Sequence, residues 1–335
     1  MSPVAPRAAQ TAPPTHHLGE PSRPPIQHYL SVADLSGAEI NALLEHALQL
    51  KHELATNGSS PHLDGRTAAL IFQKPSLRTR VSFEMAMLQL GGHALYLSPA
   101  EIQLGQREGV VDAARVLSRY VDVIVARVYL HSDVVGLARH ADVPVINALS
   151  DAEHPCQILA DLLTLRERHA TLRGLRLAYV GDGNNVANSL ALAAARLGMH
   201  ITFGCPSGYE PEASVLEAAT ADAETGGGSI ELSTDPRQAV RGANAVYTDA
   251  WYSMGQEGEA DLRAAVFRAY QVNRELLAQA APGAVAMHCL PAHRGQEITD
   301  EVLDGPASVA YDQAENRLHA QKALLLRLLA HGRAA

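Results

Sequence analysis

A short segment, KPSLRTR at residues 74–80, collects three cations and two hydroxyl groups just before a helical pattern begins. Ser76 is a good N-cap residue, and the glycine pair at 91–92 would end the helix. The first amides of a helix point outward without helical partners, and the helix dipole favours anions there. Together with the hydroxyls and the Arg78 guanidinium, they would form an oxyanion trap best suited to phosphate. The alternative is that Arg78 and Arg80 are solvated surface charges.

The same segment lacks the GxxxxGK[ST] spacing of a Walker P-loop, so the pattern does not imply a nucleoside triphosphate. Arg80 lies two positions after Arg78 and therefore faces another direction on a helix. We expect Arg80 to form a structural ion pair.

Three further residues could carry chemistry, each with a plain structural alternative. His154, in HPCQ, could donate to a carbonyl oxygen at a helix start, or be a satisfied structural histidine. No second metal ligand lies at a suitable spacing on that helix. Asp249, in TDAWYSMG, could hold a cationic amine or serve only as a turn residue. Cys289, in HCLP, is a lone thiol that could be inert or face a site.

The segment GDGNN at residues 181–185 resembles the start of a dinucleotide-binding fingerprint but lacks its third glycine, since Val186 stands there. The following apolar run ends in FGCP and supplies no acid for a ribose hydroxyl. We therefore expect no nicotinamide cofactor, and no other cofactor or metal.

Along the chain, helical patterns alternate with short β-rich runs, as in βαβ units with parallel sheets. Nine strands are expected, four before a long helix at about 154–168 and five after it: 67–72, 93–97, 121–127, 143–149, 176–182, 200–205, 229–234, 244–250 and 284–289. The prediction is an α/β protein of two doubly wound domains. The polar segments follow strands, and ligands of such sheets bind beyond the carboxyl ends of the strands, so a cleft between the domains is the expected site.

The length and composition agree with a two-domain protein and exclude some classes of protein. The 335 residues fit two ordinary domains, and a net charge of −9 argues against a non-specific nucleic-acid binder. Three scattered cysteines give no disulfide framework and suit a reducing, cytoplasmic compartment. No apolar run approaches the roughly 20 residues needed to cross a bilayer. Residues 1–27 hold seven of the 18 prolines and are expected to be a disordered lead.

Six motifs in this order, SLRTR, HPCQ, GDGNN, DAWYSMG, HCLP and AENRLH, resemble the transcarbamylases, the aspartate/ornithine carbamoyltransferase family, and within it the members that use ornithine. The resemblance covers the chain from about residue 28. It implies a carbamoyl-phosphate domain at 28–166, completed by a C-terminal helix at 313–333, and an ornithine domain at 167–312. It also implies carbamoyl transfer to the δ-amine of ornithine, which gives citrulline and phosphate.

Carried across motif by motif, the resemblance implies two sets of binding residues. The carbamoyl-phosphate set is Ser76, Leu77, Arg78, Thr79, Gln103, Arg127, His154, Gln157, Cys289, Leu290 and Arg317. The ornithine set is Asn185, Asp249, Ser253, Met254 and Leu290. Leu77 replaces the threonine of the family pattern and can offer only its backbone amide. Gln103 matches a loop that reaches a neighbouring subunit, which implies a homotrimer or a multiple of trimers.

The implied catalytic residues are Cys289, Asp249, His154 and Arg127. Asp249 and Cys289 would orient the amine and help it lose a proton, with Cys289 as the acceptor if its pKa falls near neutrality. Thr79, Arg127 and His154 would stabilise the tetrahedral oxyanion. Whether Cys289 or phosphate takes the proton is left open.

Other acceptor amines are the main alternatives. Aspartate enzymes carry an arginine after the Leu-Pro turn, where this chain has Ala292, and putrescine enzymes lack the SMG loop, which is intact here. Acetylornithine enzymes are expected to differ around SMG and SLRTR. A catalytically silent binding scaffold would be expected to lose at least one of Arg78, Arg127, His154 or Cys289. Arginine biosynthesis is favoured over citrulline breakdown, although both directions use the same residues.

Overall fold

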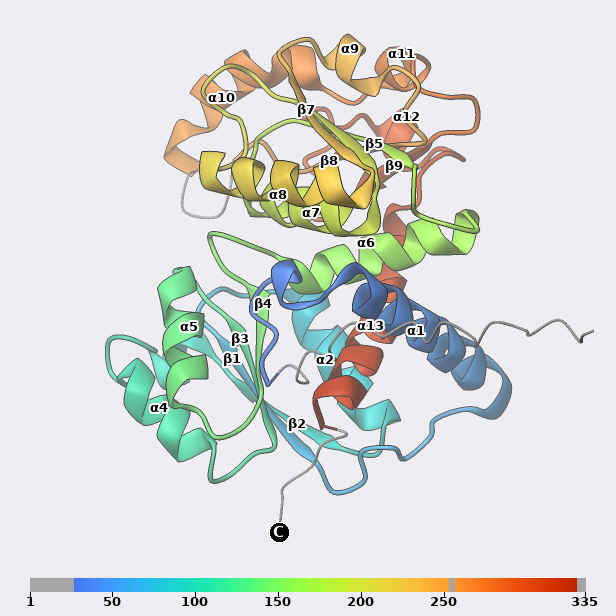
Figure 1. Ribbon diagram of the computed structural model, residues 1–335. Coiled ribbons are helices and arrows are strands. Elements are labelled where there is room, and N and C mark those ends of the chain that lie inside the picture. Colours follow the sequence, from blue (N-terminus) through green and yellow to red (C-terminus); the bar gives the residue numbers. More distant parts are fainter. Residues whose placement is uncertain (1–26, 253–256, 330–335) are drawn as a thin grey trace, which may run out of the picture.

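The computed structural model describes residues 27–252 and 257–329. Figure 1 shows two α/β lobes stacked on each other, with the long helix α6 (Pro155–Arg168) lying between them. Each lobe is built around one parallel sheet with helices on both faces. The fold class predicted from the sequence is therefore confirmed.

The first lobe contains a four-stranded sheet in the order β2-β1-β3-β4. Its strands are β1 (Thr67–Phe72), β2 (His93–Leu97), β3 (Val123–Arg127) and β4 (Val145–Leu149). One face packs against α1 (Gly37–Asn57) and α2 (Leu77–Gln89), and the other against α4 (Val110–Leu117) and α5 (His131–His140). Because side chains alternate along a strand, successive residues of β1 enter the two different cores: Ala68 and Leu70 one, Ala69 and Ile71 the other.

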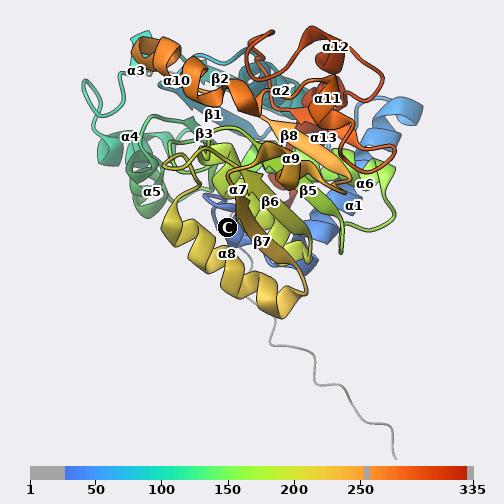
Figure 2. The same ribbon diagram turned by 90° about the horizontal axis from the view of Figure 1, so that it is seen from above.

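The second lobe contains a five-stranded sheet in the order β7-β6-β5-β8-β9. Its strands are β5 (Arg176–Val180), β6 (His200–Gly204), β7 (Ser229–Ser233), β8 (Ala245–Thr248) and β9 (Val285–His288). Helices α7 (Asn185–Leu197) and α8 (Ala213–Gly226) cover one face, as Figure 2 shows. The other face carries shorter helices: α9 (Pro236–Val240), α10 (Ala260–Phe267), α11 (Arg274–Leu277) and α12 (Asp300–Leu303).

Two helices tie the lobes together. In α6 every residue from Pro155 to Leu165 is buried, because the helix lies between the lobes. The last described helix, α13 (Ala310–Leu329), follows the second sheet but packs against α1, α2 and α6 of the first lobe. One hydrophobic core consequently runs from the first sheet through α6 and α13 to the second sheet.

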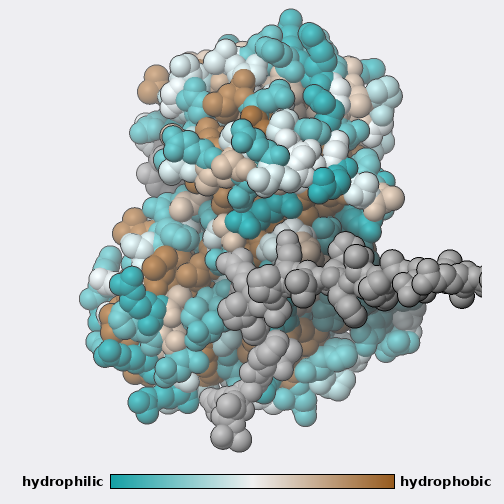
Figure 3. Space-filling view, viewed as in Figure 1, coloured by the Kyte–Doolittle hydropathy of each residue, from teal (hydrophilic) through white to brown (hydrophobic). Residues whose placement is uncertain are grey.

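All nine predicted strands are present, in the two predicted groups, and most are one or two residues shorter than the apolar runs suggested. Residues 1–26 and the end of the predicted C-terminal helix lie outside the described residues. The limits predicted for the two domains stay a prediction. On the face shown in Figure 3, hydrophilic residues predominate and apolar side chains gather in small groups. None of the described helices is long and apolar enough to cross a membrane.

Candidate active site

A cleft of about 550 Å³ opens between the lobes, where the carboxyl ends of both sheets meet. The first lobe contributes residues that follow β1, β3 and β4, and the second lobe residues that follow β5, β8 and β9. The residues that line it are Lys74, Pro75, Ser76, Leu77, Arg78, Arg127, Leu149, His154, Asn184, Asn185, Val186, Asp249, Ala250, Tyr252, Cys289, Leu290, Pro291, His293 and Arg317. The interdomain site expected from the sequence is thus a real cavity.

The start of α2 has the predicted cap. Ser76 Oγ accepts the Thr79 backbone N–H at 3.2 Å and donates to Thr79 Oγ1 at 3.0 Å. Thr79 Oγ1 also accepts from Arg317 of α13 at 2.7 Å, and the same guanidinium donates to Gln157 Oε1 at 2.6 Å. Leu77 turns its side chain to solvent, with 76% of it exposed, so only its backbone can serve this site. The start of α2 is therefore bound directly to α13, the last helix of the described residues.

Three arginines converge on this helix start without a carboxylate partner among the described residues: Arg78, Arg127 and Arg317. Burial lowers the pKa of each, and for Arg127 burial and the charges of the other two lower it to about 9. The Nε atoms of Arg127 and Arg317 are buried without a hydrogen-bond partner. Buried cations that repel each other need an anion to compensate them, so the site is suited to a multivalent anion.

His154 sits beside these cations and is neutral. Its side chain is 5% exposed, and burial followed by the charges of the three arginines lowers its pKa well below the usual range. Its backbone N–H donates to Ser189 Oγ of the second lobe at 3.0 Å, while Nδ1 is buried without a partner. A neutral imidazole with a free ring nitrogen can exchange a hydrogen bond with a ligand in the cleft.

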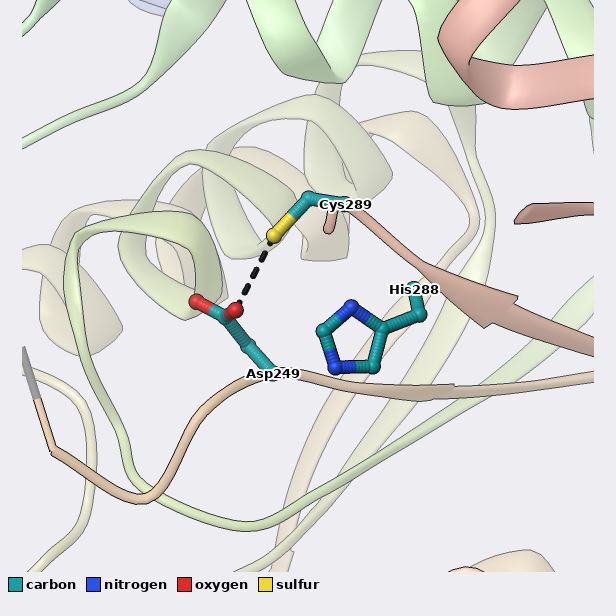
Figure 4. Close-up of side chains that lie close together, drawn as sticks. All are labelled: Asp249, His288 and Cys289. Carbon is teal, nitrogen blue, oxygen red and sulfur yellow. Dashed lines mark hydrogen bonds between the residues drawn. The ribbon is translucent and has the colours of Figure 1, made fainter. Parts of the chain in front are cut away.

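Asp249 and Cys289 line the cleft from the second lobe. Figure 4 shows their side chains pointing toward each other. The Cys289 thiol donates to Asp249 Oδ1 at 3.0 Å, and Asn184 Nδ2 donates to Oδ2 at 2.8 Å. Burial and the neighbouring Asp249 carboxylate raise the pKa of Cys289 well above its usual range. The condition for Cys289 as proton acceptor, a pKa near neutrality, is therefore not met in this structure.

His288 lies next to this pair, and the ligand atoms of Asp249, His288 and Cys289 all lie within 4.8 Å of one another. Both ring nitrogens of His288 are already engaged, however. Leu290 N–H donates to Nδ1 at 2.8 Å, and Nε2 faces Glu297 Oε1 at 3.2 Å. The group is hence organised by hydrogen bonds and does not offer three free metal ligands.

Below the cleft, α6 buries a carboxyl group at the junction of the lobes. Asp161 accepts from Gln157 and Gln313 side chains, each at 2.8 Å, and from Tyr247 Oη at 3.0 Å. Burial raises the pKa of Asp161 to about 6 despite these donors. The network connects α6, α13 and β8 beneath Arg317.

Some predicted residues do not line the cleft. Thr79 and Gln157 are fully buried and lie behind Arg317, which they position through hydrogen bonds. Gln103 is exposed, at the left-handed C-cap of the short helix α3 (Pro99–Ile102), and is not among the lining residues. Ser253 and Met254 lie outside the described residues. Asn185 does line the cleft and donates to the Ser150 carbonyl at 2.6 Å.

Sequence reasoning did not name four polar or aromatic residues that line the cleft: Lys74, Asn184, Tyr252 and His293. Lys74 is only 8% exposed, and its ammonium lies 4.5 Å from the centre of the Tyr129 ring. Asn184 caps α7 and also holds Asp249, while Tyr252 stacks on His293 with ring centres 5.1 Å apart. All four carried a sequence signal, since each belongs to a segment that follows a predicted strand.

The chain matches one family in both of its parts. The carbamoyl-P binding domain of aspartate/ornithine carbamoyltransferase matches residues 27–167, and the Asp/Orn binding domain matches residues 173–328. The chain belongs to the aspartate/ornithine carbamoyltransferase family. The resemblance drawn from the six sequence motifs is thereby confirmed.

Similar members of the aspartate/ornithine carbamoyltransferase family include an ornithine carbamoyltransferase of Pyrococcus abyssi. It is 54% identical over 302 residues, which cover 90% of this chain and 95% of that protein. An ornithine carbamoyltransferase of Pyrococcus furiosus named anabolic is also 54% identical, over 88% of this chain and 94% of its own length.

Solved structures of ornithine carbamoyltransferases are also similar to this chain. The ornithine carbamoyltransferase of Pyrococcus furiosus aligns with a TM-score of 0.89 at 52% identity and covers 92% of this chain and 98% of its own. The anabolic enzyme of Campylobacter jejuni aligns with a TM-score of 0.87 at 38% identity, over 91% of this chain and all of its own.

We expect inorganic phosphate to stabilise the protein through the three arginines. An anion at 100 times its Kd raises the free energy of unfolding by about 2.7 kcal/mol, so the thermal midpoint should rise with phosphate. In Arg127→Met this rise should shrink strongly, while the variant without phosphate should be at least as stable as the wild type, because one unpaired buried charge is gone. Arg241→Met, at an exposed arginine, is the matched control. Equal stabilisation of Arg127→Met and wild type by phosphate would contradict the anion site.

The pKa of Asp161 predicts a pH-dependent stability. Because the folded pKa lies above the usual value, the carboxyl group adds stability below about pH 4 and loses it as the pH rises through about 6. A pKa raised from 3.8 to about 6 corresponds to about 3 kcal/mol. Urea unfolding at pH 4 to 8 should therefore show Asp161→Asn gaining up to that amount over wild type, mostly below pH 6.5. An exposed control, Glu224→Gln, should show no such trend, and a pH-independent difference for Asp161→Asn would refute the assignment.

Proposed function

We propose that this protein transfers the carbamoyl group of carbamoyl phosphate to the δ-amine of L-ornithine, forming L-citrulline and phosphate. The main observation behind this proposal is that one cleft has a positively charged wall facing a wall with a carboxylate. One wall holds the unpaired arginines at the α2 start, and the other holds Asp249 with the Cys289 thiol. Family membership and relatives about half identical over most of the chain, each named ornithine carbamoyltransferase, support the same reaction. Arginine biosynthesis is the favoured direction, since two relatives are named anabolic.

Carbamoyl phosphate would bind with its phosphate at the start of α2. The first helix amides, including that of Leu77, would meet its oxygens, and Arg78, Arg127 and Arg317 would neutralise the dianion. Burying these cations without a carboxylate partner costs free energy, and the phosphate of the bound substrate would offset that cost. Thr79 and Gln157 would contribute by fixing Arg317, not by touching the substrate.

The carbamoyl group would extend from the phosphate toward the second lobe. His154 is neutral, so it can donate one hydrogen bond to the carbamoyl oxygen without adding charge. The backbone carbonyls of Cys289 and Leu290 are proposed to accept from the carbamoyl amide. Charge that develops on the oxygen in the tetrahedral intermediate would be stabilised by Arg127 and His154, which are in place before the reaction.

The δ-amine of ornithine has to be neutral to attack, although its free pKa is close to that of lysine, about 10. Asp249 is proposed to bind this amine, because Asn184 and Cys289 already fix the direction of its carboxylate. Since Cys289 keeps its proton, the proton released by the amine would pass to Asp249 or to the phosphate that leaves. The amine nitrogen then bonds to the carbamoyl carbon, the bond to the phosphate oxygen breaks, and phosphate remains in the arginine site.

The amino-acid end of ornithine is assigned to Asn185, to the Leu290 backbone and to Ser253 and Met254. Gln103 is proposed to act in a neighbouring subunit of a homotrimer, since it lies away from the cleft of its own chain. The apolar residues that α2 exposes, Leu77, Val81 and Leu88, support such an assembly, because surfaces of this kind are commonly buried between subunits. A cytoplasmic location is proposed on the cysteine pattern alone.

Acceptor specificity gives the direct test of the function. Purified protein is mixed with carbamoyl phosphate and, separately, ornithine, putrescine, N-acetylornithine or aspartate, and ureido product is measured. We expect product from ornithine and little from the other three, because Ala292 provides no cation for a second carboxylate of aspartate. Product from another amine in preference to ornithine would reassign the acceptor, and product from none would contradict carbamoyl transfer.

Asp249→Asn keeps the shape of the side chain but removes its charge. If Asp249 binds the amine and helps remove its proton, kcat should fall by about 10²–10⁴-fold. The phosphate-dependent stabilisation should remain, since the arginines are untouched. Asp261→Asn, an exposed residue of α10, should leave turnover unchanged. Unchanged turnover in Asp249→Asn would mean that the carboxylate has no part in the reaction.

A further inference from the structure

A buried carboxylate behind the cleft remains without a role. Glu297 is 0% exposed and forms no ion pair with a lysine or arginine among the described residues. Its Oε1 accepts the His293 backbone N–H at 2.5 Å and lies 3.2 Å from His288 Nε2. His288 is itself 0% exposed, so the two side chains form a pair that is sealed from solvent beneath the cleft wall.

The hydrogen bonds around this pair determine which nitrogen of His288 carries the proton. A carboxylate only accepts, so His288 Nε2 has to donate to Glu297. The neutral ring then has a lone pair on Nδ1, and the Leu290 backbone N–H donates to it at 2.8 Å. The opposite tautomer would leave the Leu290 N–H facing another N–H. Glu297 thereby decides whether His288 can accept from Leu290.

Leu290 needs this support because of its backbone conformation. It has φ +58°, in the left-handed region that a residue with a Cβ seldom adopts. Among the described residues outside glycine, only Gln103 shares a positive φ. The turn also orients the carbonyls of Cys289 and Leu290 and the thiol that donates to Asp249. A hydrogen bond to the Leu290 N–H therefore stabilises the part of the backbone that forms the cleft wall.

We infer that Glu297 is a positioning residue for carbamoyl transfer, acting through His288 to hold the Cys289–Leu290 turn in the geometry that the reaction uses. This inference rests on the proposed function of that turn. A purely structural alternative is that Glu297 only fastens the loop after β9 through the His293 N–H. The two roles differ in what happens to His288 and to kcat.

Two pairs of variants test the inference. The His288 pair separates the two roles, because both Glu297 variants also act on the contact with the His293 N–H. Glu297→Gln keeps an oxygen that can accept from His288 Nε2–H, whereas Glu297→Leu has no acceptor. His288→Asn places its amide oxygen near the former Nδ1 and can still accept from Leu290 N–H, whereas His288→Leu cannot. We expect Glu297→Leu and His288→Leu to lower kcat by about 10- to 100-fold, as supporting residues of catalytic groups commonly do. Glu297→Gln and His288→Asn should retain most of it.

The loss should fall on kcat more than on the KM of carbamoyl phosphate, because the phosphate is proposed to bind at α2, away from the turn. Glu301→Gln, at an exposed residue of α12, is the control and should behave as wild type. Thermal unfolding of each variant shows whether it is folded at the assay temperature. Folded Glu297→Leu or folded His288→Leu with wild-type kcat would overturn the inference, and so would equal losses in Glu297→Leu and Glu297→Gln.

A spectroscopic measurement on the intact wild-type protein tests the hydrogen bonds of His288, and can overturn the inference, even if the leucine variants fail to fold. With ¹⁵N-labelled histidine, the signals of His288 are assigned by their absence from His288→Asn. We expect a protonated Nε2 and an unprotonated Nδ1 at neutral pH, preserved in Glu297→Gln. A protonated Nδ1 would overturn the inference. If wild type forms no citrulline in the same assay, the proposed function fails, and the tautomer result still tests the role of Glu297 in holding the turn.

Discussion

The excess of positive charge at the start of α2 constrains the rest of this structure. Three guanidinium groups lie at a helix end that is itself positive, and burial lowers the pKa of each. For Arg127 and Arg317, repulsion from neighbouring arginines lowers the pKa further. Moving an unpaired ion out of water costs several kcal/mol, so such an arrangement persists only where well-packed elements hold it. The rigid elements around it, β1, β3, α6 and α13, supply that support.

The opposite wall is organised by neutral donors instead of cations. The Cys289 thiol and the Asn184 amide hold the Asp249 carboxylate, which leaves a negative group with a fixed direction facing a positive site. A substrate pair with a phosphate at one end and an amine at the other would find both charges matched. Because the two walls of the cleft have opposite charge, a few local cations are sufficient to attract an anion although the chain has a net charge of −9.

Much of this arrangement could be predicted from the sequence, because local signals carry it. The β-rich runs gave the nine strands, and Ser76 and the glycines after Leu90 gave the bounds of α2. Arg80 pairs with Glu84 at 2.9 Å, as its position on the helix predicted. The sequence could not show which side chains reach the cleft. Thr79 and Gln157 follow the family pattern, yet the Arg317 guanidinium from α13 lies between them and the cleft. The role of Gly183 also could not be read from the sequence. A Cβ at this position would lie 2.2 Å from the Glu210 carbonyl carbon, so the glycine is needed for packing and not for binding a pyrophosphate.

The path of α13 also has a consequence for the synthesis of this protein. Arg317 lines the cleft beside the start of α2, yet it is synthesised about 150 residues after Arg168, the last residue of α6. At about 5–20 residues per second, the first lobe would wait roughly 10–30 s for the helix that covers α1, α2 and α6. During that time its apolar helix faces would stay open, and a chain that stops short of Ala310 could not close them. The order of the elements along the chain thus makes the nascent first lobe dependent on the final helix, although both sheets are complete before that helix is made.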